Sequence, residues 1–222
     1  MPRPPLRFPW ECHWTAPVPT CYPAGSLFYR VQDAEFDDRS SPLHFGRDPE
    51  GDRRWNPSQD ARPQYGVLYA GTTPEAAIVE TLLHDEGGGV IGLSELKQRS
   101  LWTFSTGKPL CLVDLAGPAL KRLRHDGKLL VTDQLDYPRA WSHALHESLP
   151  GVHGLLFPAR PAPEYRSVAL FERSADRVGC QSSHEVSRIR LLDWVDPRTG
   201  RNIIDWLWDF GVTVHDDGVG LW

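Results

Sequence analysis

YGVLYAGTTPEAAIVETLLHD, residues 65–85, joins a short buried strand to a buried helix. Residues 66–70 are an apolar run with Val and Tyr that ends at Gly71, which is typical of a buried strand. Thr73 is a favourable helix N-cap, and Pro74 suits the first helical position, where its missing N–H costs nothing. The residues that follow have almost no polar face, so the sequence predicts a helix that is buried on most sides.

One carboxylate, that of Glu80, is set into this apolar helix. A buried Glu costs free energy unless it is paired, hydrogen-bonded or protonated, and such positions are common in functional sites. The stretch alone leaves two interpretations open with equal weight. Glu80 is either a functional carboxylate or a structural one bonded to a neighbouring Arg.

Composition and charge exclude several classes of protein. A chain of 222 residues fits one domain. A net charge of −5 leaves no basic excess to neutralise phosphates, which argues against direct nucleic-acid binding. Because the chain has no long apolar run and no signal-peptide pattern, we expect a cytoplasmic protein that does not bind membranes. The four Cys (Cys12, Cys21, Cys111 and Cys180) form no CxxC pair, which favours free thiols over disulfides or a zinc site.

The order of the elements indicates one α+β domain behind an arm. The first 25 residues are rich in Pro and predict an extended arm over the core, with residues 26–222 forming the domain. Strands are predicted at 26–31, 66–70, 100–106, 109–115, 152–157 and 167–172, and helices near 119–124, 137–149 and 202–210. Because these do not alternate strictly, we expect mixed sheets with flanking helices. A long polar segment, 33–62, has the length of a functional loop.

Arginine, aromatic and acidic side chains occur around these elements in a set suited to a nicotinamide dinucleotide. Arg30 ends the first predicted strand, Arg54 lies in the long polar segment, and Tyr69 lies in the strand before the helix. A guanidinium can bind pyrophosphate through two hydrogen bonds, and an aromatic ring can stack on nicotinamide. The carboxylate of Glu80 could hold a ribose hydroxyl and stabilise an oxocarbenium-like transition state.

In its motifs the chain resembles the RES domain family from about Phe28 to Phe171. The motifs are FYR at 28–30, RWN at 54–56, VLYAGTTPEAA at 67–77, IVETLLH at 78–84 and GLLFPAR at 154–160. The resemblance implies an ADP-ribosyltransferase-like fold and an enzyme that degrades NAD by hydrolysis or phosphorolysis of the nicotinamide–ribose bond. It also implies the toxin of a bacterial toxin–antitoxin pair, held inactive by an antitoxin that carries a helix-turn-helix.

The resemblance also implies roles for individual residues. Glu80 and Arg54 would be catalytic, and Arg30, Arg54, Tyr69 and Arg160 would bind NAD as the substrate, with no metal expected. The chain between Arg54 and Tyr69 is several residues longer than is usual in the family. Where the family commonly has Ser, this chain has Ala159, so we expect weaker NAD binding from the missing hydroxyl.

Two other functions are compatible with the sequence. One is an ADP-ribosyltransferase that modifies a macromolecule, and the other is a degenerate scaffold that binds a partner or nucleotide without turnover. Retention of Glu80 with Arg54 and Tyr69 favours activity, whereas Ala159 favours the inert scaffold. The sequence leaves open whether water, phosphate or a macromolecule accepts the ribosyl group. His143 and His146 are interpreted as ordinary surface or packing residues, because no carboxylate is spaced to complete a metal site with them.

Overall fold

The computed structural model describes residues 7–36, 42–48, 53–83, 89–178 and 186–218. An eight-stranded sheet has the order β1-β6-β7-β8-β3-β2-β5-β9, beside a two-stranded sheet of β4 and β10. The strands are β1 (Thr20–Tyr22), β2 (Leu27–Asp33), β3 (Val67–Gly71), β4 (Val90–Gly92), β5 (Arg99–Ser105), β6 (Leu110–Asp114), β7 (Gly154–Pro158), β8 (Arg166–Phe171), β9 (Ser187–Arg190) and β10 (Thr213–His215). The α-helices are α1 (Pro74–Leu82), α2 (Leu93–Lys97), α3 (Pro118–Arg122), α4 (Lys128–Val131), α5 (Asp136–Ser148) and α6 (Ile203–Trp208). The predicted mixed α+β domain is therefore confirmed.

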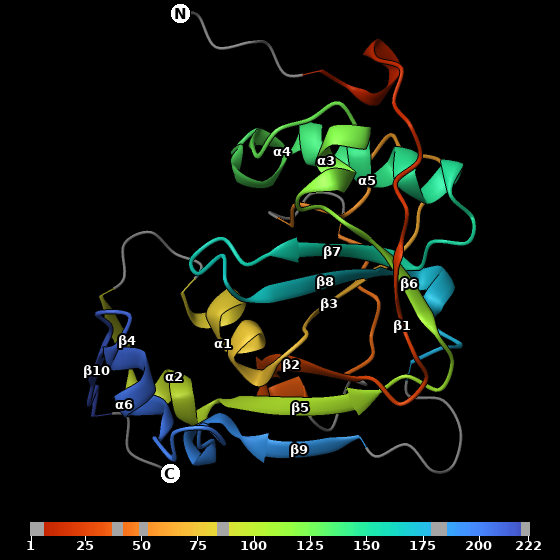
Figure 1. The fold of residues 1–222 in the computed structure, drawn as a ribbon. Helices are drawn as coiled ribbons and strands as arrows, with labels where there is room; N and C mark the ends of the chain where they lie inside the picture. Colours follow the sequence, from red (N-terminus) through yellow and green to blue (C-terminus); the bar gives the residue numbers. More distant parts are fainter. Residues whose placement is uncertain (1–6, 37–41, 49–52, 84–88, 179–185, 219–222) are drawn as a thin grey trace, which may run out of the picture.

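One parallel pair of strands explains where the helices lie. In the large sheet β6 and β7 are parallel, whereas the other neighbouring strands run antiparallel. Parallel neighbours cannot be joined by a tight turn, so the chain crosses over through α3, α4 and α5. These helices form a layer beside β7, while α1 lies between β8 and β2 (Figure 1). The helices α3–α5 form one group and α1 forms another, and both groups pack on the same face of the large sheet.

The predicted strand and helix around Gly71 are confirmed. The Oγ1 atom of Thr73 accepts a hydrogen bond from the amide of Ala76, and Pro74 is the first helical residue. Gly71 lets α1 lie directly on β3, since a Cβ atom at this position would come within 2.4 Å of the Ala77 amide nitrogen. Leu83 caps the described helix, and residues 84–85 of the stretch lie outside the described residues.

Replacing Gly71 with Ala should destabilise the domain by about 1–3 kcal/mol, because the added methyl group must displace backbone atoms of α1. Chemical denaturation of the two proteins measures the difference. Gly46→Ala is the control, since a Cβ atom there meets nothing within 4 Å and the change should have little effect. Equal stability of Gly71→Ala and the unchanged chain would contradict the described contact between β3 and α1.

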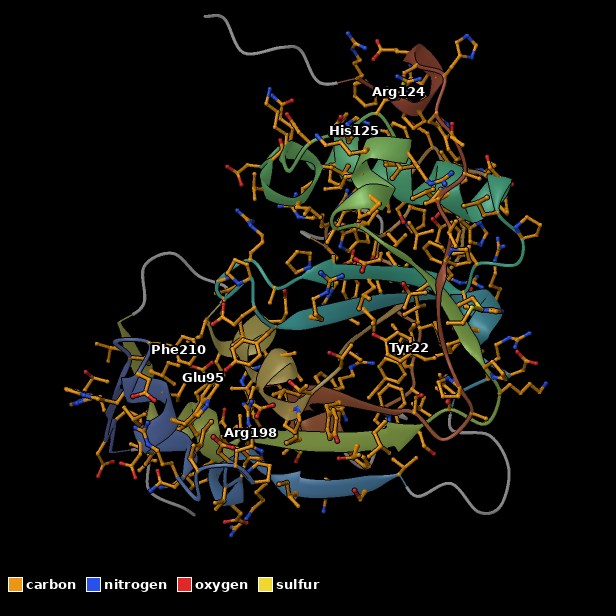
Figure 2. All side chains as sticks on the ribbon, viewed as in Figure 1. Tyr22, Glu95, Arg124, His125, Arg198 and Phe210 are labelled. Carbon is orange, nitrogen blue, oxygen red and sulfur yellow. A yellow bond between two sulfur atoms is a disulfide. The ribbon has the colours of Figure 1, made fainter. Side chains whose placement is uncertain are left out.

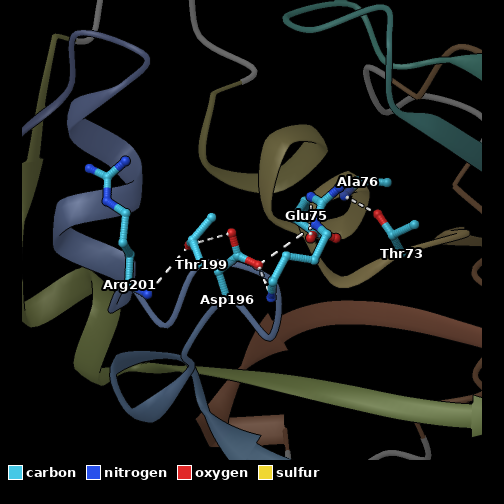
Figure 3. Close-up of polar contacts among 7 residues, drawn as sticks. Thr73, Glu75, Ala76, Asp196, Thr199 and Arg201 are labelled. Carbon is cyan, nitrogen blue, oxygen red and sulfur yellow. Dashed lines mark hydrogen bonds and ion pairs between the residues drawn. The ribbon is translucent and has the colours of Figure 1, made fainter.

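A second buried carboxylate on α1, that of Glu75, was not predicted. Its side chain is 4% exposed and accepts a hydrogen bond from the Nη2 atom of Arg198 at 2.7 Å. Arg198 follows Asp196, whose carboxylate accepts hydrogen bonds from the Arg198 amide and the Thr199 hydroxyl (Figure 3). These contacts join the C-terminal segment to the first turn of α1, where the helix dipole also favours a negative charge. Arg198 and Phe210 both lie in this segment (Figure 2).

The N-terminal arm is more structured than the predicted extended chain. Its described part forms a short 3-10 helix, Pro9–Glu11, and ends in β1, which pairs with β6. The prediction of free thiols is wrong for Cys21 and Cys111, which form a disulfide. The reason is the register, which places these two residues opposite each other in antiparallel strands. Cys12 is a free thiol, and Cys180 and the first six residues lie outside the described residues.

Among the described helices, none is both long and apolar enough to cross a membrane. Apolar side chains fill the interior in three clusters. One lies between the large sheet and α3–α5, one packs α1 against β2, β5 and α6, and one covers the opposite face of the sheet. The first two clusters hold in place the elements that carry the candidate site.

Candidate functional site

A cavity of about 840 Å³ opens where α1, β2, β3, β7 and β8 meet the long polar segment. Its lining includes every residue that the sequence singled out for catalysis or binding: Arg30, Arg54, Tyr69, Glu80 and Arg160. The predicted convergence of these residues on one pocket is thus confirmed. Their chemical roles stay predictions.

Tyr69 fixes the long segment to the sheet. Its hydroxyl accepts a hydrogen bond from the Trp55 amide at 2.9 Å and donates one to Oδ1 of Asn56 at 3.1 Å. Trp55 is 1% exposed, and its carbonyl oxygen accepts a hydrogen bond from the hydroxyl of Ser142 in α5. Burial raises the pKa of Tyr69, so its hydroxyl keeps the proton that it donates. Residues 54–56 are therefore held rigidly at the cavity wall.

Arg54 is a cavity-lining cation whose charge interacts with the carboxylate of Glu80. Its Nη1 atom donates a hydrogen bond to the carbonyl oxygen of Thr132 at 2.7 Å. Burial and the positive charge of Arg160 lower the pKa of Arg54 to about 10, while the carboxylates of Asp133 and Glu80 act in the opposite direction. Arg54 consequently stays positively charged at neutral pH, between a carboxylate on α1 and the Arg160 side chain.

Glu80 lies in the last full turn of α1 and lines the cavity. Its Oε1 atom is shielded from water, although the residue as a whole is only half-buried. The carboxylate is close enough to Arg54 to stabilise its charged form. The sequence left a structural and a functional interpretation open, and the position of Glu80 on the cavity wall favours the functional one.

Arg30 and Arg160 lie on different sides of the cavity. In β2, Arg30 donates hydrogen bonds from Nη1 to the carbonyl oxygens of Pro42 and His44 at 2.9 and 3.2 Å. Burial and the charge of Arg53 lower its pKa to about 10. Arg160 is more exposed, and its Nη2 atom lies 3.3 Å from the Oδ1 atom of Asp133. Both guanidiniums are held in place before any ligand binds.

Ala159 does not face the cavity. It is fully buried in the apolar cluster around α1 and α6, and its amide donates a hydrogen bond to the carbonyl oxygen of Tyr165. A serine hydroxyl in the cavity wall belongs instead to Ser167, on the neighbouring strand β8. Ser167 is 2% exposed, and its Oγ atom makes no hydrogen bond within the described part of the chain. The missing hydroxyl at Ala159 therefore no longer argues for weaker NAD binding.

Ala159→Ser should consequently destabilise the protein without improving its binding of a ligand. The new hydroxyl would lie in an apolar cluster, and burying such a group without a partner costs about 1–3 kcal/mol. Denaturation curves would show the loss of stability, and steady-state kinetics would show an unchanged KM. A lower KM in the Ser variant would mean that this side chain reaches the cavity after all.

Sequence reasoning assigned no role to some residues that line the cavity, of which Arg53 is the most informative. Its guanidinium carbon lies 5.2 Å from the centroid of the Tyr69 ring. The doublet Arg53-Arg54 was visible in the sequence, but a pattern of side chains does not reveal that both members of the doublet line the cavity. His44 and Asp133 also line the cavity, and both come from segments without regular periodicity.

The paired histidines of α5 pack against an aromatic ring. The rings of His146 and Tyr65 stack with centroids 3.8 Å apart, and His143 stacks on the same ring at 6.1 Å. The interpretation of these residues as packing histidines is confirmed.

Comparison with known proteins identifies the family and the fold of the chain. A sequence model of the RES domain matches residues 27–192. In the crystal structure titled as the M. tuberculosis MbcT-MbcA toxin-antitoxin complex, one chain is similar, with a TM-score of 0.57 and 17% identity. The match covers 77% of the present chain and 86% of that chain. No curated protein matches the sequence significantly. At this identity the structural likeness establishes the fold.

Proposed function

The chain belongs to the RES domain family, and we propose that it is an enzyme that cleaves the nicotinamide–ribose bond of NAD. The observation that carries this proposal is the cavity whose lining brings the guanidiniums of Arg30, Arg54 and Arg160 together with the carboxylate of Glu80. Arg30 and Arg54 donate hydrogen bonds to main-chain carbonyl oxygens, which are neutral, and the carboxylates of Asp133 and Glu80 also act on the charge of Arg54. A pyrophosphate is suited to such donors, which bind it bidentately.

The residues of the cavity have separate tasks in this mechanism. The arginines bind the pyrophosphate and fix the position of the nicotinamide ribose. Glu80 accepts a hydrogen bond from a ribose hydroxyl, and its negative charge stabilises the positive charge that develops on the ribose as nicotinamide departs. The carboxylate is partly shielded from water, which strengthens this electrostatic effect. Nicotinamide leaves with the bonding electron pair, and an acceptor then attacks the ribose carbon.

We propose further that the protein is the toxin of a toxin–antitoxin pair and that it acts in the cytoplasm, where NAD is abundant. Support comes from the family and from the similar chain, whose structure is titled as a toxin–antitoxin complex. A helix-turn-helix antitoxin is the partner that this assignment implies. Expression of the chain alone in a bacterium should arrest growth, and a co-expressed antitoxin should relieve the arrest.

Release of nicotinamide from NAD by the purified protein tests the proposed reaction. The assay is run in buffer alone, with added inorganic phosphate, and with a protein acceptor. A rate that depends on phosphate indicates phosphorolysis, and a rate that needs neither addition indicates hydrolysis. Label transfer to the protein acceptor would indicate an ADP-ribosyltransferase. Absence of nicotinamide release under all three conditions would refute the proposal.

A further inference from the structure

Arg53 is exposed, lines the cavity and lies over the ring of Tyr69. Its distance of 5.2 Å from the ring centroid is within the range of a cation–π interaction. The ring itself cannot move easily, because its hydroxyl is bonded to both Trp55 and Asn56. The Arg53 carbonyl oxygen also accepts a hydrogen bond from Nε of Arg139 at 3.3 Å. A rigid platform and an anchored main chain therefore hold the Arg53 guanidinium at the cavity.

The position of Arg53 has a consequence for Tyr69. A ring face that carries a guanidinium is not open to a flat ligand. On this face Tyr69 supports Arg53 and holds the loop at 54–56, so a nicotinamide ring that stacked there would have to displace the Arg53 guanidinium.

The charge of Arg53 is close to that of Arg30. Burial is the larger cause of the lowered pKa of Arg30, and the charge of Arg53 adds to it, as expected of two like charges that lie near each other. On the opposite side of the cavity Arg160 acts on Arg54 in the same way. Two pairs of cations thus face one cavity. Like charges brought together repel each other, and an anion bound between them relieves the repulsion; beside Arg54 and Arg160 the carboxylate of Asp133 already does so in part.

We propose that Arg53 is a phosphate-binding residue, which together with Arg30 binds the pyrophosphate of a dinucleotide substrate on the platform of Tyr69. This inference rests on the proposed function and assigns one further residue to it. The alternative is that Arg53 is a surface cation that only covers an aromatic ring. A role limited to covering the ring does not explain why the positive charge of Arg53 lies close to the half-buried Arg30.

The test is calorimetric binding of ADP-ribose, which contains the pyrophosphate but not the scissile bond. Arg53→Met keeps a stem over the Tyr69 ring and removes the charge, so it should weaken binding by roughly 10- to 100-fold, the range for a lost hydrogen bond to a charged group. Arg53→Lys should give an intermediate loss, since an ammonium lacks the planar fork. Inorganic pyrophosphate should displace ADP-ribose from the unchanged protein and much less effectively from Arg53→Met.

The matched control is Arg188→Met. Arg188 also lies over an aromatic ring, 5.8 Å from the centroid of Trp102, but it does not line the cavity. This control should bind ADP-ribose as the unchanged protein does, and melting temperatures check that all variants are folded. Equal ADP-ribose affinity of Arg53→Met and the unchanged protein would overturn the role of Arg53 and leave the proposed function standing. If the unchanged protein neither binds ADP-ribose nor cleaves NAD, the proposed function itself fails.

Discussion

Glu80→Gln should lower the rate of nicotinamide release from NAD by about a hundredfold or more while the fold stays intact. Glutamine has nearly the same shape as glutamate but carries no negative charge opposite the developing positive charge on the ribose. Removing one such electrostatic contact costs roughly 3–4 kcal/mol of transition-state stabilisation. Because Glu80 lines the cavity and is only half-buried, the amide should be accommodated without repacking of α1.

Glu75→Gln is the matched control for this experiment. Glu75 lies on the same helix and is more deeply buried, but it contacts Arg198 outside the cavity. The control should change the thermal stability and leave kcat nearly unaltered. Single-turnover rates for both variants, with circular dichroism to check folding, make the comparison. If Glu80→Gln cleaves NAD within a few-fold of the unchanged rate, Glu80 is a structural residue.

The strand before α1 and the start of α1 could be predicted from the sequence, because both depend only on residues that are close together in the chain. The N-cap Thr73, the first-turn Pro74 and the apolar strand before them depend on neighbouring residues only, and the structure contains all three. The order of the longer strands and helices also followed from apolar periodicity. The motifs that suggested Arg30, Tyr69 and Glu80 are attached to predictable elements, whereas Arg54 comes from the long polar segment, and all of these line one cavity with Arg160.

Features that depend on pairing between distant strands could not be predicted. Cys21 and Cys111 are 90 residues apart, and only the register of β1 against β6 places them together. The short strands β4 and β10 pair across an even longer separation and contain only three residues each. No local pattern identifies strands of that length.

The position of Ser167 shows that a serine eight residues from the family position can still place its hydroxyl in the cavity wall. Ala159 lies at the end of β7 in the expected sequence motif, yet its side chain packs into an apolar cluster. Ser167, eight residues later, pairs with Gly71 on one side and Phe157 on the other. Side chains of paired residues project from the same face of a sheet, so Ser167 lies on the face that α1 covers beside Gly71.

Arg54→Met should reduce kcat/KM for NAD by about a hundredfold, or about 3 kcal/mol, within the range for truncating one member of a buried charge pair. Methionine keeps the apolar stem but cannot bind a phosphate or donate to the Thr132 carbonyl oxygen. Arg54→Lys should recover only part of this loss, because one ammonium cannot form the two parallel bonds of a guanidinium.

The same substitution should also change the dependence of the rate on pH. The attraction between Arg54 and Glu80 favours the ionised carboxylate, as the effect of Glu80 on the Arg54 pKa indicates. Without the cation, protonation of Glu80 becomes easier, so the acid limb of the kcat profile should move to higher pH. In Arg54→Lys the positive charge is kept, and the limb should stay near its original position. A hundredfold loss in Arg54→Met with an unmoved acid limb would mean that Arg54 binds the substrate without acting on Glu80. A rate within a few-fold of the unchanged protein would remove Arg54 from the site, because a phosphate-binding guanidinium cannot be replaced by a thioether.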